Sequence, residues 1–350
     1  MATARLLKWK GYHMQPAIEE DAMTDHTITP AAPREILLRP RGQDEDAYPQ
    51  VHDVPALRAY FEREGFVVLR RMLPQAACEA ARLAFLREVL PARHAYFKRH
   101  ASGRYERNVY TEYGHMKYPI MNLQDIGGRR FGQFRQRGLE LLTHPDLKRL
   151  MRGLFGEPAR LAHTMYFDGN QATWAHRDGD YVDTAQAGRM VGVWIAAEDI
   201  HPDAGRFYVL PGSHRVAMPE IGHPNGDRYK ARMADFVHQG PLDCVAPLMR
   251  QGDVILWSSL TVHGSLPTTD PRQSRRSFTG HYVPDSQPAR RHLSDAATDR
   301  YVAVNNVAIM LHQECHTLRG VLKTALQSDY PLLYGALHGL SAMLPRRRHS

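Results

Sequence analysis

The chain has 350 residues, of which 43% are hydrophobic and 23% charged, an ordinary composition for a globular protein with a buried core. Its formal net charge is +8, but the basic residues are scattered, so we expect no nucleic-acid binding. No run approaches the roughly 18 uninterrupted apolar residues of a membrane span. Three widely spaced cysteines argue against a disulfide framework and a zinc-cysteine site, and the cytoplasm is the expected compartment.

The first 50 residues differ from the rest of the chain in composition and hydrophobic periodicity. Residues 1–50 combine five prolines with mixed charge and no sustained periodicity, which predicts a flexible leader. The compact part begins near Pro55, with a helix over 56–63 that Gly65 ends. An apolar, β-branched strand over 66–69 and a helix over 74–90 come next along the chain.

From residue 160 onward, short apolar runs alternate with turns rich in Gly, Pro and Asp. This texture predicts a sandwich or jelly roll rather than a parallel doubly wound sheet. Residues 213–250 form a long insertion between strands, of the kind that often covers a site as a lid. The predicted strands are 161–167, 190–198, 207–210, 254–257 and 277–283.

Residues 291–350 are expected to form a helical extension with a basic tail at Arg346–Arg348. Within it, Gly335–Leu344 fits either an interfacial helix or a helix packed on the core, and we favour the core. A second basic cluster lies at Arg93–His100. Both clusters contain or border apolar and aromatic residues, which favours an acidic substrate or a weak membrane-surface contact over nucleic acid. The sequence leaves the oligomeric state open.

Three tripeptides have a histidine two residues before an aspartate, and their context separates them. His144 precedes a proline and a run with helical spacing, which is typical of a helix start. His201 lies in a turn composition between two apolar runs. Only His176 follows a predicted strand and has a second histidine, His263, in a comparable setting downstream. We therefore select His176 and Asp178 as candidate metal ligands.

Two histidines and one carboxylate suit three positions on one face of a metal ion and leave the other face open. Such a ligand set is typical of non-haem Fe(II) sites that react with O₂. Arg275 follows His263 by twelve residues (275 − 263 = 12), and a guanidinium offers a bidentate fork to an acidic co-substrate. The pattern predicts an iron site at His176, Asp178 and His263, with an anion site at Arg275.

Over about residues 54–285, the chain resembles the phytanoyl-CoA dioxygenase family of Fe(II)/2-oxoglutarate oxygenases. Each similar segment is moderately specific, and their order along the chain makes the resemblance strong. One departure is Ala204, which stands where the family usually has Asn. The segments are Tyr60–Leu69 at the family's opening, Asp203–Arg215 with its Pro-Gly-Ser-His turn, and Gly252–Trp257 followed by His263-Gly264-Ser265 at the distal ligand.

The resemblance implies a double-stranded β-helix, or cupin-like jelly roll, with supporting N-terminal helices, over a domain at 51–290. It implies that His176, Asp178 and His263 bind Fe(II), and that the distal carboxylate of 2-oxoglutarate binds an arginine. Family members place this arginine six residues before the histidine of a strand-ending His-aromatic pair, which selects Arg275 (281 − 275 = 6) and leaves Arg276 as the alternative.

Two further residues are candidate co-substrate contacts by this resemblance. Ser265, two residues after His263, is either a second contact or a turn hydroxyl. Tyr166, on the strand before the first ligand, is either a co-substrate contact or a core residue.

The implied reaction couples oxidative decarboxylation of 2-oxoglutarate by O₂, which gives succinate and CO₂, to oxidation of an unactivated C–H bond in a small molecule. Ascorbate is expected to stimulate it. Related halogenases have a small residue where this chain has Asp178, so the carboxylate favours hydroxylation over halogenation. Desaturation, epimerisation and cyclisation stay open. The competing interpretation is a jelly-roll metal-binding protein without oxygenase activity.

Overall fold

The computed structural model describes residues 48–50, 52–99, 104–218, 226–287, 290–291, 300–311 and 317–343. The predicted leader, apart from residues 48–50, and the basic tail lie outside them. None of the helices in these ranges is both long and apolar enough to cross a bilayer.

The largest sheet of the described chain, here called the major sheet, has eight strands in the order β1-β9-β7-β11-β5-β14-β13, with β4 also paired to β5. The β14–β5 pair is parallel, and the other pairs are antiparallel. The strand bounds are β1 Phe66–Leu69, β4 Ile120–Met121, β5 Ala159–Phe167, β7 Val191–Ala196, β9 Val254–Ser258, β11 Ser277–Pro284, β13 Tyr301–Val304 and β14 Val307–Met310.

A second, short sheet lies across the interior from the major sheet. This minor sheet joins β8 (Phe207–Val209) to β10 (His263–Ser265) in antiparallel register. Apolar side chains of β1, β7 and β9 pack with those of β8 in one buried cluster, which fills the space between the sheets. The arrangement is the predicted jelly roll, and the strands predicted from alternation and turns are confirmed to within a few residues. Two further strand pairs are β2 (Tyr96–Lys98) with β3 (Tyr105–Arg107), and β6 (Val182–Asp183) with β12 (Arg290–Arg291).

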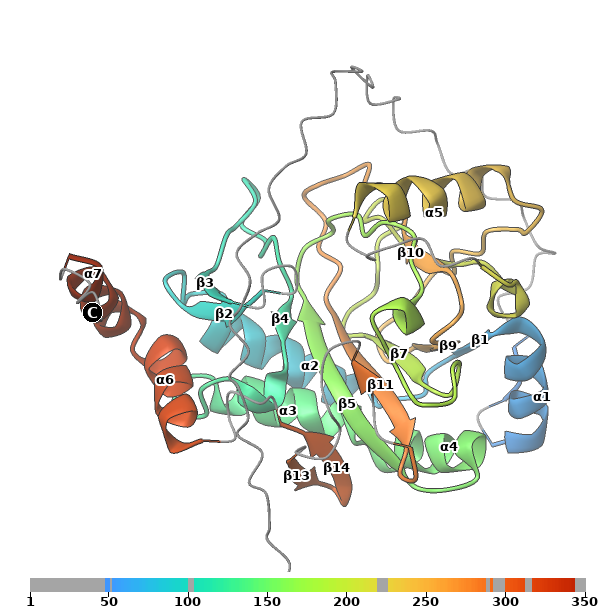
Figure 1. Ribbon diagram of the computed structural model, residues 1–350, viewed down its shortest axis with the longest axis horizontal. Helices are drawn as coiled ribbons and strands as arrows, with labels where there is room; N and C mark the ends of the chain where they lie inside the picture. Colours follow the sequence, from blue (N-terminus) through green and yellow to red (C-terminus); the bar gives the residue numbers. More distant parts are fainter. Residues whose placement is uncertain are drawn as a thin grey trace, which may run out of the picture. The chain divides into compact units, whose positions relative to one another are not determined.

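Helices cover the other face of the major sheet (Figure 1). Helix α1 (Val54–Glu64) is capped by the Asp53 carboxylate, which accepts a hydrogen bond from the Ala56 amide at 3.0 Å. It ends at Gly65, whose φ of 77° is the left-handed conformation that glycine adopts at helix ends. The other helices on this face are α2 (Gln75–Ala84), continued by a π-helical turn at Phe85–Val89, α3 (Gly132–Leu142) and α4 (Pro145–Phe155).

Helix α3 approaches β11 closely at Gly138. A Cβ there would lie 2.7 Å from the Phe278 ring, so only glycine allows this separation of helix and strand. Phe278 and Tyr166 face each other in the register of β11 and β5, and both point toward the helices. Alternation therefore turns Ser277, Thr279 and His281 of β11 toward the jelly-roll interior.

The chain after residue 226 contains elements beyond those predicted from the sequence. Helix α5 (Asp227–Gln239) forms within the predicted insertion at 213–250. Strands β13 and β14 extend the major sheet from the segment expected to be helical. Helices α6 (Leu318–Asp329) and α7 (Pro331–Met343) come after them.

Candidate functional site

Three side chains meet in the jelly-roll interior: His263 from β10 of the minor sheet, and His176 and Asp178 from the connection between β5 and β6. The Nε2 atoms of His176 and His263 lie 3.4 and 3.6 Å from Oδ1 of Asp178. Backbone hydrogen bonds of 3.0 Å in both directions join His176 to His263, so the two rings start from paired positions. A first-row ion with ligand distances of roughly 2.1 Å accommodates donors at these separations. The structure thus brings together the three residues selected from the sequence.

Both imidazoles are oriented by a main-chain carbonyl two residues earlier. Nδ1 of His176 donates to the Trp174 carbonyl at 2.9 Å, and Nδ1 of His263 donates to the Thr261 carbonyl at 3.0 Å. This fixes the proton on Nδ1 and leaves the Nε2 lone pair for a metal, which is the usual second contact of a metal-binding histidine.

Asp178 is held by two residues that the sequence pattern did not single out for the site. Nε1 of Trp257 donates to Oδ2 at 2.8 Å, and Nε2 of His281 donates to the same oxygen at 3.0 Å. Oδ2 is therefore occupied, and Oδ1 is the oxygen beside the two histidines. The sequence contained an indication for His281, because alternation along 275–281 places it on the same strand face as Arg275. Nothing in the sequence distinguishes Trp257 from a core tryptophan.

The pKa shifts of His263 and Asp178 favour the protonation states that bind a metal. Burial lowers the pKa of His263 to about 4, which keeps its ring neutral at physiological pH. Burial opposes ionisation of Asp178, but its interactions with the neighbouring imidazoles of His263, His281 and His176 hold the pKa of this carboxyl well below its usual range. For His176, burial opposes protonation, but hydrogen bonding to Asp178 gives a net rise in pKa. Neutral imidazoles and an ionised carboxylate are the forms that bind Fe(II).

Arg275 and Arg276 have opposite surroundings. Arg275 is 4% exposed, and its Nη atoms donate to the main-chain carbonyls of Gly205 and, at 2.9 Å, Gln171. Burial lowers its pKa to about 10, and no carboxylate among the described residues pairs with it. Arg276 instead forms ion pairs of 2.9 Å with both Asp168 and Glu198 on the helix side of the major sheet.

The other two predicted contacts lie in different places. Ser265, on β10, is buried, and its Oγ accepts a 2.7 Å hydrogen bond from the Thr173 amide, so it fastens the loop before His176. Tyr166 points away from the cluster and packs among Phe85, Phe134 and Phe278, with ring centroids 4.6–4.9 Å away. Its position on β5 turns the ring toward the helices, so the structure favours the interpretation of Tyr166 as a core residue.

Helix α5 contacts the segment that carries the first two ligands. The hydroxyl of Tyr229 donates to Oδ2 of Asp180 at 2.6 Å and accepts from the Arg177 amide at 3.2 Å. Lys230 lies over the Trp174 ring, 4.8 Å from its centroid. The insertion thereby covers the turn that contains Asp178.

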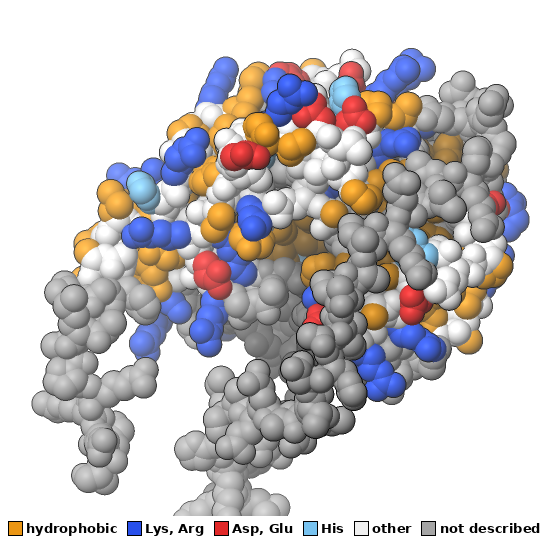
Figure 2. All heavy atoms as spheres, turned by 90° about the horizontal axis from the view of Figure 1, so that it is seen from above, with side chains coloured by type: hydrophobic (Ala, Val, Ile, Leu, Met, Phe, Trp, Pro, Cys, Tyr) orange, Lys and Arg blue, Asp and Glu red, His pale blue; other side chains and the backbone are white. Residues whose placement is uncertain are grey.

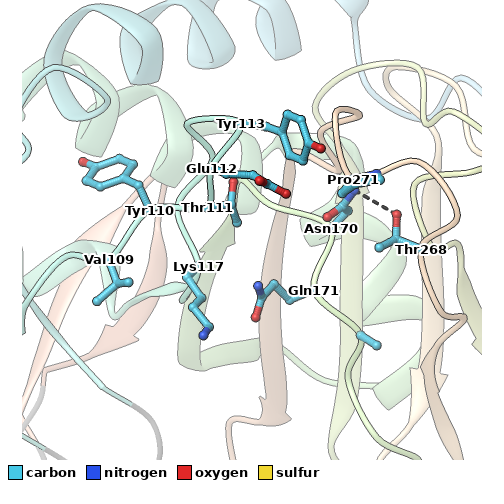
Figure 3. Close-up of a pocket in the computed structure, with 11 residues that line it drawn as sticks. Val109, Tyr110, Thr111, Glu112, Tyr113, Lys117, Asn170, Gln171, Thr268 and Pro271 are labelled. Carbon is cyan, nitrogen blue, oxygen red and sulfur yellow. Dashed lines mark hydrogen bonds between the residues drawn. The ribbon is translucent and has the colours of Figure 1, made fainter. Parts of the chain in front are cut away.

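A pocket of about 480 Å³ opens beside the loop that leads to His176. Figure 3 shows residues of 109–117 on one side of it and residues around Asn170 and Thr268 on the other. The main chain of Gln171, in its wall, accepts the hydrogen bond from Arg275. Asn170 is fixed by hydrogen bonds to Thr268 Oγ1 at 2.9 Å and to two carbonyls of the 270–273 turn.

Comparison with known proteins identifies the family. The family model described as phytanoyl-CoA dioxygenase (PhyH) matches residues 61–277, which is more than half of the chain. The chain belongs to the phytanoyl-CoA dioxygenase family. This is a family of Fe(II)/2-oxoglutarate-dependent oxygenases, and its model spans all three residues of the metal-type cluster and Arg275.

Curated relatives within the family are distant and match in part. The phytanoyl-CoA dioxygenase domain-containing protein 1 of Danio rerio is 27% identical over 115 residues, which are 31% of this chain and 38% of the relative. Its Dictyostelium discoideum homologue is 30% identical over 131 residues, which are 35% of this chain and 46% of that homologue. The peroxisomal phytanoyl-CoA dioxygenase of Homo sapiens is 23% identical over 224 residues, which are 59% of this chain and 62% of the human enzyme. The chain thus spans less than two thirds of each relative.

Solved structures share the fold. The epimerase SnoN, in complex with Fe³⁺, α-ketoglutarate and nogalamycin RO, is 19% identical and aligns with a TM-score of 0.51 over 74% of this chain and 98% of SnoN. EctD from S. alaskensis with bound Fe is 20% identical, with a TM-score of 0.50 over 73% of this chain and 86% of EctD. At these identities the likeness shows the fold alone.

Proposed function

We propose that this protein is a 2-oxoglutarate-dependent hydroxylase that oxidises an unactivated C–H bond of a small molecule. In this proposal His176, Asp178 and His263 hold Fe(II), and Arg275 binds the distal carboxylate of 2-oxoglutarate. The observation that carries it is the buried guanidinium of Arg275, which has carbonyl partners and no described carboxylate. Burying a charge without a counter-ion is costly, so an anionic ligand is the natural partner.

When bound, Fe(II) would supply the redox chemistry by which O₂ and 2-oxoglutarate give succinate, CO₂ and an oxidised substrate. The protein's own groups bind and orient. Trp257 and His281 hold Oδ2 of Asp178, which leaves Oδ1 as the oxygen that would hold the metal together with His176 and His263. Ser265 fixes the loop before His176 through the Thr173 amide and is the second candidate contact to 2-oxoglutarate.

The pocket beside Gln171 is the proposed entry for the substrate (Figure 3). It combines the exposed charges of Lys117 and Glu112 with the aromatic ring of Tyr113, so a polar or acidic small molecule fits its chemistry. Helix α5 is the proposed lid, because Tyr229 contacts Asp180 and Arg177, the neighbours of Asp178.

The test is substrate-dependent release of succinate. Purified protein with Fe(II), ascorbate, 2-oxoglutarate and fractions of a metabolite extract should release succinate in the presence of the fraction that contains the substrate. His176→Ala should abolish this release, because the metal loses one of three protein ligands. Full turnover by this variant would contradict the metal assignment.

The product separates the possible reactions. Hydroxylation adds one oxygen atom to the substrate, desaturation or cyclisation removes two hydrogen atoms, and epimerisation leaves the mass unchanged. A product that gains no oxygen would overturn the hydroxylase assignment and retain the cofactor chemistry. A protein that binds the metal but neither binds nor consumes 2-oxoglutarate would be the metal-binding alternative.

A further inference from the structure

Helices α6 and α7 expose an unusual number of large apolar side chains. Leu318 is 76% exposed and Leu332 is 67% exposed, whereas such residues are normally at least half buried in a folded chain. We call the following set the apolar face of α6–α7: Leu318, Val321, Leu322, Leu332, Leu333 and Leu337. Large apolar side chains exposed together on one helix pair are typical of a binding surface.

The rest of the protein contacts this helix pair through other residues. The ring of Tyr334 packs edge-on against Tyr96, with centroids 5.1 Å apart. The carboxylate of Asp329 accepts a 3.0 Å hydrogen bond from the Arg130 amide. Aromatic and polar groups thus attach the pair to the fold, while the leucines point elsewhere. The expectation that the segment from Gly335 onward packs on the core is therefore wrong for Leu337, which is exposed.

Basic residues flank the apolar face. Along α6, Leu318, Val321 and Leu322 have i, i+3, i+4 spacing, and the exposed Arg319 and Lys323 lie one position further round the helix. Helix α7 carries no charged residue. On the left of Figure 2, the end where α6 and α7 lie in Figure 1, hydrophobic and basic side chains occur together.

The charge of this part of the sequence is strongly positive. Residues 317–350 contain Arg319, Lys323 and the run Arg346–Arg348, against the single acidic residue Asp329, which gives a formal net charge of +4 (5 − 1). A second copy of the chain would bring the same positive charge to the face. An anionic surface complements it.

We propose that α6 and α7 bind the surface of an anionic lipid bilayer. The apolar face enters the boundary between headgroups and acyl chains, and the flanking Lys and Arg side chains contact acidic headgroups. The helices have 12 and 13 residues, whereas a span needs about 20, so they lie along the bilayer.

The experiment is co-sedimentation of the full chain with lipid vesicles. The chain should bind vesicles that contain phosphatidylglycerol at least tenfold more tightly than vesicles of phosphatidylcholine alone, and salt should weaken this binding. Leu322→Ser with Leu333→Ser should weaken it more than tenfold with every charge retained. Arg319→Gln with Lys323→Gln should weaken it roughly 25-fold, because each basic residue contributes about fivefold near an acidic membrane.

Two matched variants control for non-specific effects of a basic protein. Leu248→Ser changes a leucine that is 38% exposed outside α6–α7, and Arg152→Gln removes an exposed charge on α4. Both should bind vesicles like the unmodified chain, and all variants should melt at the same temperature. The proposal is overturned if anionic vesicles do not bind, or if the leucine variant binds them as well as its control. It is also overturned if the leucine variant abolishes a dimer seen by sedimentation equilibrium while no form binds vesicles, since the face then pairs two copies.

Discussion

The two neighbouring arginines just before β11 have opposite surroundings because their side chains face opposite sides of the sheet. Arg275→Leu should weaken 2-oxoglutarate binding by about 30-fold or more, since truncating one partner of a buried charge pair costs roughly 2 kcal/mol or more. Its melting temperature should be unchanged or higher, because the substitution removes an unpaired buried cation.

Arg276→Leu is the matched variant. It leaves Asp168 and Glu198 without their shared partner, so stability should fall by roughly 3–5 kcal/mol, while the affinity for 2-oxoglutarate at low temperature stays near that of the unmodified protein. Thermal melting and calorimetric titration separate the two effects. If both variants lost the same affinity for 2-oxoglutarate, the placement of Arg275 on the interior face and Arg276 on the helix face would be wrong.

Trp257 contacts Asp178, the proposed carboxylate ligand, through its indole N–H. Trp257→Phe keeps an aromatic ring in the interior but removes the N–H that donates to Oδ2, so metal affinity should fall about tenfold. Competition with a chelator for Fe(II) or Co(II) measures this directly. Trp194→Phe, in the same buried cluster, is the control and should bind metal normally. If both variants bind metal as well as the unmodified chain, Trp257 serves packing alone.

At this scale the sequence selected residues whose type suits a chemical task, and the structure brings His176, Asp178 and His263 together. His176, Asp178, His263 and Arg275 stand out because their spacing matches a known ligand pattern. The sequence did not distinguish Trp257 and Tyr166 from ordinary core residues. Alternation along a strand does not show which of the two sheet faces an aromatic side chain occupies. For Tyr166 the neighbouring helices decide, and these come from residues 85 and 134, far away in the chain.

At the scale of elements, the Tyr229 hydroxyl joins α5 to the turn that contains Asp178. Tyr229→Phe removes the hydrogen bonds to Asp180 and the Arg177 amide and should cost about 1 kcal/mol locally. Hydrogen exchange over Asp227–Gln239 should therefore quicken several-fold, and α4 serves as the internal control. Unchanged exchange in α5 would mean that other contacts hold the proposed lid.

Elements with a strong local pattern were predicted, and those that depend on distant partners were not. Helix α1 has its cap, its proline and its terminal glycine in the sequence itself. Strand β14 pairs in parallel with β5, about 150 residues earlier, and nothing local indicates that partner. Helix α5 lies in an insertion rich in turn-forming residues, which hid its helical spacing.

At the scale of the whole molecule, the jelly roll brings the candidate ligands of the β5–β6 connection and of β10 to one interior position, so ligand binding should stabilise the fold. Fe(II) together with 2-oxoglutarate, each at about 100 times its dissociation constant, should add roughly 2.7 kcal/mol per ligand to the free energy of unfolding. The melting temperature should rise by several degrees under anaerobic conditions, and His263→Ala should lose this rise. A rise that persists in His263→Ala would place metal binding elsewhere.

The most direct test of the oxygenase assignment is an anaerobic calorimetric titration of 2-oxoglutarate into the protein with and without Fe(II). The proposed site predicts tight binding when Fe(II) is present, at least tenfold weaker binding without it, and a comparable loss for Fe(II)-loaded Arg275→Leu. Equal affinity with and without the metal, or no binding in either state, would contradict it.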